Sequence, residues 1–273
     1  MTTAVDIITP VGGDALRPRA AGLIHDLGSI AGRALRAVPR DVESIVPAIF
    51  IALFFFLVNV ATMETAIEAQ APGLSYTAFQ MPTAILLGVT GVSRAYALVL
   101  DIQNGYFDRL LLTPVRRLAI LVGHMIADVT VACVLAIPIL ALGLLMGVDF
   151  EAGILGIPAF IAIAGLWSLA FAGFGYAIAL KTGNPAAVQS SFLLFFPFLF
   201  LTTSYVPRSQ LSPWLDTVAS FNPVTYLLEG MRSLVLAGWE WDELGKSVLA
   251  VGIVGTASMS MCFAALRGRI RRG

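Results

Sequence analysis

Long apolar runs separated by short polar stretches dominate the chain after about residue 40. Six of these runs approach the roughly 20 apolar residues that a helix needs to cross the hydrocarbon core of a bilayer. Pro138 and Pro197 lie deep in the third and fifth runs and predict kinks there, because proline cannot donate the helical hydrogen bond. We therefore predict an all-α membrane protein with six transmembrane helices, at residues 44–61, 79–100, 118–147, 154–180, 186–206 and 247–266.

The first 43 residues follow a different pattern. Residues 1–20 mix Thr, Asp, Gly, Pro and Arg without a period, which predicts a flexible tail. In residues 21–43 the apolar positions recur at helical spacing while the arginines stay off that face. This pattern is typical of an amphipathic helix lying in the headgroup layer. The predicted organisation is completed by a transmembrane domain at 44–267 and a basic tail at 268–273.

The composition agrees with a polytopic membrane protein. Of 273 residues, 58% are hydrophobic and 12% are charged, against roughly 25% charged in ordinary soluble domains. The mean hydropathy is +0.87. Cys133 and Cys262 both lie inside apolar runs, and we interpret them as small buried side chains in preference to a disulfide.

The distribution of positive charge predicts the orientation. With the N-terminus in the cytoplasm, 14 of the 17 lysines and arginines fall on the inner side, and only Arg208, Arg232 and Lys246 fall outside. Cytoplasmic loops of membrane proteins carry such an excess of Lys and Arg. We therefore expect both termini to be cytoplasmic.

The longest charge-rich stretch inside the apolar body is DIQNGYFDRLLLTPVRR, residues 101–117. Gly105 and Pro114 bracket eight residues, which can form two helical turns with one apolar and one polar face. The stretch joins the second and third predicted spans and therefore lies at the inner surface. We predict a helix that lies on the inner membrane surface and binds a soluble partner.

A second helix without the length to cross is predicted at 221–238. Asn222 is a suitable N-cap and Pro223 suits the first helical position. Glu229 and Arg232 interrupt its apolar face, and a crossing here would move the basic C-terminus outside. We interpret it as a re-entrant or interfacial helix on the outer face that follows a shorter helix at 212–219, the extracellular helices together occupying 207–238.

No residue pattern predicts covalent chemistry. Gly245-Lys246-Ser247 matches only the end of a phosphate-binding loop, and two histidines without paired cysteines do not indicate a metal site. We predict a chain that is not an enzyme, binds no cofactor or metal, and has no nucleic-acid partner.

Ionisable residues within spans are functional candidates because burying them is costly. Arg94, His124 and Asp128 lie in the inner parts of the second and third spans, on either side of the 101–117 stretch. They could form a proton relay or a structural Arg94–Asp128 pair, and we favour the pair.

Two sets of residues occur in a fixed order along the chain. The first is Asp101-x-x-x-Gly105-x-x-Asp108-Arg109 with Pro114, Gly123 and Asp128, and the second is Phe200–Pro207, Pro213-Trp214-Leu215, Asn222-Pro223-Val224-Thr225 and Glu229-x-x-Arg232. With these residues the chain resembles the permease subunits of ABC-2-type exporters, most closely the daunorubicin-resistance-like branch, and the resemblance implies the fold of type V ABC exporters. His124 departs from the branch, where arginine usually follows the glycine.

The resemblance implies that 101–117 is a coupling helix received by a cytoplasmic ABC ATPase. It implies two ATPase copies carrying ATP and Mg, and a second permease chain that is identical or homologous. The expected cargo is a hydrophobic drug, lipid or glycolipid, exported across the cytoplasmic membrane of a prokaryote. The coupling residues would be Asp101, Gly105, Tyr106, Asp108, Arg109, Pro114, Arg116 and Arg117.

A substrate pathway is expected along the second and fifth spans, at Thr90, Ser93, Phe195, Phe198 and Thr202. Two other functions remain as alternatives. A proton-driven secondary transporter would show inverted repeats and charges at the midplane, and a membrane assembly subunit without a transport role would need no coupling segment.

Overall fold

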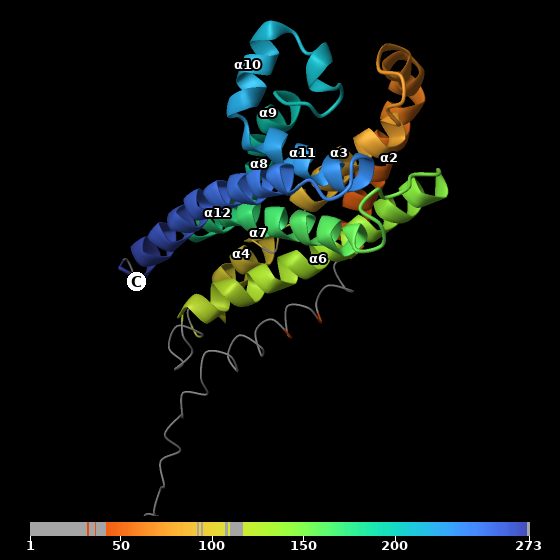
Figure 1. Ribbon diagram of the computed structural model, residues 1–273. Coiled ribbons are helices and arrows are strands. Elements are labelled where there is room, and N and C mark those ends of the chain that lie inside the picture. The colour runs from red at the N-terminus through yellow and green to blue at the C-terminus, as the bar shows by residue number, and fades with distance from the viewer. Residues whose placement is uncertain are drawn as a thin grey trace, which may run out of the picture.

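The computed structural model describes residues 42–91, 93, 95–106, 109 and 117–271, together with Gly32 and Arg36 (Figure 1). Within these ranges every regular element is a helix, as predicted. The predicted amphipathic helix at 21–43 therefore lies almost wholly outside the described residues. The elements are α2 (Val42–Gln70), α3 (Tyr76–Thr90), α4 (Ala95–Gln103), α6 (Arg117–Leu145), α7 (Gly156–Thr182), α8 (Pro185–Ser191), the 3-10 turn η2 (Phe192–Leu194), α9 (Phe195–Phe200), the 3-10 turn η3 (Arg208–Gln210), α10 (Pro213–Phe221), α11 (Pro223–Leu236) and α12 (Trp241–Ile270).

Five helical stretches are long and apolar enough to cross a membrane, at 45–70, 76–103, 121–145, 156–182 and 241–269. They correspond to five of the six predicted spans. The prediction for 186–206 was wrong in extent, because the apolar helix there is the shorter Pro185–Phe200. Residues 201–206 form bends instead of helix, since other side chains hold their backbone, as described below.

The first span is longer than predicted. α2 continues to Gln70, beyond the expected end at residue 61. Its last turns are held by α3: the Tyr76 backbone N–H donates to Glu68 Oε1 at 2.9 Å, and the Thr77 hydroxyl donates to Glu64 Oε1 at 3.1 Å. The two acidic residues therefore extend the helix by accepting hydrogen bonds from the start of its neighbour.

α7 is the central helix and packs against both α12 and α6 (Figure 1). Its contact with α12 is close because small residues meet there. A Cβ placed on Gly173 would lie only 2.9 Å from Ser258 Cβ, and the Ser258 hydroxyl donates to the Ala170 carbonyl at 2.5 Å. The backbones of α7 and α12 are thereby held together.

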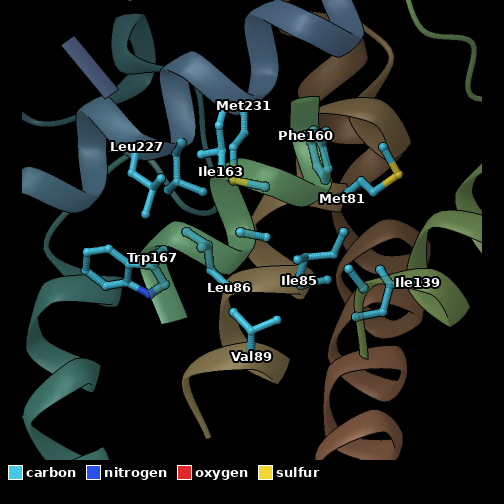
Figure 2. Close-up of a cluster of buried hydrophobic side chains, with 14 of the residues drawn as sticks. Met81, Ile85, Leu86, Val89, Ile139, Phe160, Ile163, Trp167, Leu227 and Met231 are labelled. Atoms are coloured by element: carbon cyan, nitrogen blue, oxygen red, sulfur yellow. The ribbon is translucent and has the colours of Figure 1, made fainter. Parts of the chain in front are cut away.

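Most buried apolar side chains belong to one cluster, which we call the main core. It gathers residues of α2, α3, α6, α7, α9, α11 and α12, and Figure 2 shows α11 closing over the core with Leu227 and Met231. The labelled members from the other helices are Met81, Ile85, Leu86, Val89, Ile139, Phe160, Ile163 and Trp167.

A separate cluster, which we call the second core, gathers residues of α4, α6, α7, α8 and α12. In contrast, α2 and α12 leave many apolar side chains exposed, among them Phe50, Phe54, Leu249 and Ile253. Such exposure is normal for a multi-pass membrane protein, whose helices face lipid or a neighbouring chain.

Candidate functional site

The predicted coupling segment, 101–117, begins in the last turn of α4, which contains Asp101 and Gln103. Gly105 has a φ of +67°, a conformation that suits glycine, and the Arg109 backbone N–H donates to its carbonyl at 3.2 Å. The exposed Tyr106 follows this turn. α6 begins at Arg117, and the predicted coupling residues Asp108, Pro114 and Arg116 lie outside the described residues. The helical coupling segment as a whole therefore stays a prediction.

Two contacts attach the start of this segment to the neighbouring helices. Asp101 Oδ2 lies 3.6 Å from His124 Nε2 on α6, and the imidazole is only 3% exposed. The Gln103 amide donates to the Gly183 carbonyl at 3.0 Å, in the turn that ends α7. A displacement of the segment would consequently reach α6 and α7 as well as α4.

Asp128 is buried one turn further along α6, with 2% of its surface exposed. The Tyr176 hydroxyl of α7 donates to Asp128 Oδ2 at 2.6 Å. Arg94 lies outside the described residues, so the Arg94–Asp128 pair stays a prediction. The sequence reasoning missed Tyr176, because a single tyrosine in an apolar span gives no local signal of its partner.

The residues proposed for the substrate pathway are not brought together in one place. Phe195 is fully buried in the main core, whereas Phe198 is 47% exposed. Thr202 is buried against Thr225, with 2.5 Å between the two hydroxyl oxygens. Their role in a pathway stays a prediction.

Thr90 and Ser93 do share one small pocket with a volume of about 20 Å³. A space of this size has room for about one water molecule. The Trp167 indole N–H donates to the Thr90 hydroxyl at 2.9 Å beside it. The complete lining is Val89, Thr90, Ser93, Ser168, Phe171, Ala172, Gly175 and Ser191.

The irregular segment 201–206 is buried at its centre, residues 202–204, and side chains from other helices satisfy its backbone. Asn222 donates through Nδ2 to the carbonyls of Phe198 and Leu201, at 2.6 and 2.8 Å. The Thr83 hydroxyl donates to the Ser204 carbonyl at 3.0 Å, and the Tyr76 hydroxyl donates to the next carbonyl, of residue 205, at 2.9 Å. Non-helical backbone inside a membrane protein is tolerated where protein groups satisfy it in place of water.

Arg232 of α11 is the centre of the same network and is only 6% exposed. Its Nε donates to the Phe79 carbonyl and its Nη1 to the Thr203 hydroxyl, both at 3.0 Å. Its Nη2 lies 3.3 Å from Thr83 Oγ1 and 3.4 Å from the Ser204 carbonyl oxygen. The guanidinium carbon also lies 3.5 Å from the centroid of the Phe79 ring. Arg232 thus joins α3 to the irregular segment.

The helix predicted around 221–238 is confirmed as α11. Asn222 is its N-cap, with Oδ1 accepting from the Val224 N–H at 3.0 Å, and Pro223 occupies the first turn. Burial raises the pKa of the half-buried Glu229 carboxyl, and the nearby Glu243 raises that pKa further. Local capping signals therefore located this helix, but they did not reveal the partners of Arg232.

α11 and α12 form a hairpin whose close approach depends on Gly230. A Cβ at this position would lie 2.4 Å from Ser247 Cβ and 3.0 Å from the Glu243 carbonyl oxygen. The backbone N–H groups of Glu151 and Ala152 donate to the last carbonyls of α11, at 3.1 and 3.0 Å. α11 is therefore fixed at both ends and along one face.

Comparison with known proteins supports the resemblance. The family model described as ABC-2 type transporter matches residues 27–236. The chain is 27% identical over 275 residues to the daunorubicin resistance ABC transporter permease protein DrrB1 of Streptomyces coeruleorubidus, covering 93% of this chain and 94% of the relative. It is 25% identical over 211 residues to the probable doxorubicin resistance ABC transporter permease protein DrrC of Mycobacterium tuberculosis, covering 76% and 75%.

A third relative is the probable multidrug ABC transporter permease YbhR of Escherichia coli, which is 24% identical over 203 residues, covering 73% of this chain and 55% of the relative. The family match extends over most of the chain, including α2 to α11. The protein therefore belongs to the ABC-2 type transporter family, as a multi-pass membrane permease.

Proposed function

We propose that the chain is the permease of an exporter that moves a hydrophobic or amphipathic compound, driven by a separate ATPase. ABC-2 permeases work with an ATPase subunit in ABC transporters. The observation that carries the proposal is the turn at Gly105, which follows α4. The end of α4 just before this turn is attached to α6 through Asp101 and His124. The chain has no phosphate loop, so energy from ATP has to enter through such a contact.

In this proposal the segment 101–117 docks on the ATPase. The contact residues are Asp101, Gly105, Tyr106, Asp108, Arg109, Pro114, Arg116 and Arg117. ATP binding moves the docked segment, and the permease then shifts between inward- and outward-facing states because the ATPase binds one state better than the other. Gln103 and Asp101 carry the displacement to α7 and α6 through the contacts described above.

The proposed assembly has two permease chains, identical or homologous, above two ATPases that hold ATP and Mg. Both permease termini are cytoplasmic, in the cytoplasmic membrane of a prokaryote, and α10 and α11 lie at the outer face with α11 re-entrant. The excess of Lys and Arg on the inner side supports this orientation. The relatives' names support a drug as cargo, and lipids and glycolipids share its amphipathic chemistry.

The test is the charge reversal Asp108→Lys with Arg109→Glu. The variant is expected to fold in mild detergent but to lose the ATPase, measured by affinity purification of the tagged permease from its native host followed by mass spectrometry. The matched control is Asp216→Lys with Arg208→Glu, which reverses an exposed ion pair with 2.6 Å between Nε and Oδ1 at the proposed outer face. The control should retain the ATPase.

Two results would overturn the proposal. One is that the ATPase stays bound to the Asp108/Arg109 variant, which would move the contact elsewhere. The other is that the native chain purifies alone and moves daunorubicin into liposomes without ATP, as a proton-driven transporter would.

A further inference from the structure

The last turns of α12 carry exposed cations at one edge of the helical bundle, at the end marked C in Figure 1. Arg267 and Arg271 are both exposed, and the Arg271 backbone N–H donates to the Arg267 carbonyl at 3.3 Å. Their side chains therefore leave the same face of the helix, one turn apart. Gly268 keeps the surface beside them open, since no heavy atom lies within 4 Å of a Cβ placed on it.

A third exposed cation lies at the adjoining end of α7. The two helix ends are in contact, because Arg269 Nη1 donates to the Leu180 carbonyl at 3.5 Å. The next residue of α7, Lys181, is exposed. Within the described residues, neither Arg267 nor Arg271 forms an ion pair with a carboxylate. The charge of these two guanidinium groups is therefore available to an anionic ligand.

The face that carries the two arginines continues along the membrane span as an exposed stripe, which we call the α12 stripe. Counted back from Arg267, it contains Ala264, Ser260, Ala257, Thr256, Ile253 and Leu249. Ile253 and Leu249 are 62% and 65% exposed. The hydroxyls of Ser260 and Thr256 each donate to the carbonyl one turn back, at 2.7 Å. The stripe therefore presents no unsatisfied polar group to an acyl chain.

The dimensions of the α12 stripe match those of a lipid in one leaflet. Half of the hydrocarbon core is roughly 15 Å thick, which corresponds to about ten residues of helix. Counted from Arg267, this length reaches Ala257, and the exposed residues between them on the stripe are Ser260 and Ala264. These small side chains leave a shallow surface on which an acyl chain can lie, while Arg267 and Arg271 lie at headgroup depth.

We propose that the α12 stripe binds an anionic phospholipid, with the headgroup phosphate held by Arg267 and Arg271 and an acyl chain along Ala264, Ser260 and Ala257. Guanidinium groups bind phosphate oxygens through paired, charge-assisted hydrogen bonds. Lys181 adds to the attraction for a net negative headgroup over a zwitterionic one. The assignment to the cytoplasmic leaflet rests on the proposed function, in which the C-terminus is cytoplasmic, whereas the binding itself does not.

The experiment measures lipid binding to the permease purified in mild detergent with whatever subunits accompany it. The protein is titrated with dioleoylphosphatidylglycerol or dioleoylphosphatidylcholine, and native mass spectrometry resolves the bound lipids. The first phosphatidylglycerol is expected to bind about 25-fold more tightly than phosphatidylcholine, because each of the two arginines strengthens binding to an anionic headgroup roughly fivefold.

The test variant is Arg267→Gln with Arg271→Gln. Its Kd for phosphatidylglycerol is expected to rise by about 25-fold, and its Kd for phosphatidylcholine should not change. The matched control, Arg208→Gln with Lys246→Gln, removes the same two charges from exposed ion pairs outside the stripe and should keep the wild-type Kd.

Equal Kd values of the wild type for the two lipids, or an unchanged phosphatidylglycerol Kd in the test variant, would overturn the lipid site. Loss of the ATPase or of a second permease chain from the test variant at an unchanged Kd would place a protein on this face instead. If the test variant does not fold, the wild type decides the matter. Its preference for phosphatidylglycerol should weaken when salt is raised from roughly 0.1 to 1 M, because salt screens exposed charges, and a constant preference would refute the site.

The leaflet is tested separately with Gly268→Cys in a Cys133→Ala background, because a side chain at residue 268 meets open space. A membrane-impermeant maleimide is expected to label this cysteine in inside-out vesicles but not in intact cells. Labelling in intact cells would overturn the cytoplasmic leaflet and the orientation in the proposed function, and would leave the lipid binding measured in detergent standing. A preparation without any ATPase would likewise count against the proposed function alone.

Discussion

Replacing Arg232 by methionine is expected to lower the free energy of unfolding by roughly 2–4 kcal/mol. The methionine keeps the length and apolar stem of the side chain but removes all four hydrogen bonds to α3 and to residues 203–204. The Ser204 carbonyl keeps the Thr83 hydroxyl as a donor. The Phe79 carbonyl and the Thr203 hydroxyl each lose a charged donor.

The magnitude follows from those two lost bonds. A hydrogen bond from a charged donor contributes about 1.5–3 kcal/mol, so two amount to roughly 3–6 kcal/mol. Removing a buried charge also removes its desolvation cost, which offsets part of this loss. Arg232→Lys is expected to fall between wild type and Arg232→Met, because a compact ammonium cannot reach both α3 and the irregular segment in place of the planar guanidinium.

The assay is thermal unfolding in mild detergent, followed by tryptophan fluorescence. A loss of 2–4 kcal/mol corresponds to a decrease in Tm on the order of 5–15 °C for a protein of this size. The control is Arg208→Met, since Arg208 is 44% exposed in its ion pair with Asp216. Exposed pairs contribute about 1 kcal/mol or less. Equal Tm values for Arg232→Met and Arg208→Met would refute the bridging role assigned to Arg232.

Three further changes test other contacts. Gly230→Ala is expected to prevent the close packing of α11 on α12 and to lower the free energy of unfolding by at least about 1–3 kcal/mol through overpacking. Its control is Gly252→Ala, which should be neutral or slightly stabilising because no heavy atom lies within 4 Å of the added Cβ. Tyr176→Phe should cost about 1.5–3 kcal/mol because its hydroxyl donates to a carboxylate, against about 0.5–1.5 kcal/mol for Tyr226→Phe, whose hydroxyl donates to a carbonyl. Glu229→Gln should raise Tm at neutral and alkaline pH but not below pH 4.5, the ordinary pKa of the carboxyl.

The sign of the pH effect follows from proton binding. The pKa of Glu229 is raised in the folded state, so the folded protein binds its proton more tightly than the unfolded chain. The wild-type protein therefore loses stability as pH rises from 4.5 through the raised pKa, and the Gln variant does not. A constant Tm difference across this range would contradict the raised pKa. Equal effects of the two tyrosine variants, or of the two glycine variants, would contradict the contacts assigned to them.

The length and apolarity of the runs predicted six spans; five of them correspond to helices long enough to cross a membrane, and the fifth in chain order, at 186–206, was wrong at its end. Residues 201–206 are apolar enough to prolong a helix, yet their carbonyls are held by Asn222, Thr83 and Tyr76, which lie about 20 to 130 residues away in the chain. No local pattern contains such distant contacts. The same reason explains why Asp128 was recognised as a candidate while its partner Tyr176, on another helix, was not.

Local signals succeeded where the cause is itself local. The N-cap Asn222 and the following Pro223 predicted the start of α11, because both act on the first turn of their own helix. The coupling segment is predicted from Gly105 and its charges, and the structure describes only its beginning, so its docking role stays a proposal.

The contacts of Arg232 have a consequence for how the protein is made. Its partner Phe79 precedes it by 153 residues, which corresponds to roughly 8–30 s of synthesis. During that interval the Phe79 carbonyl in the nascent chain lacks the Arg232 donor, which has not yet been made. α11 can take its place only after α3 is already inserted, and α12 then packs on it through Gly230. The α11–α12 hairpin is therefore expected to be the last part to mature, and the part that membrane quality-control proteases recognise first when it fails.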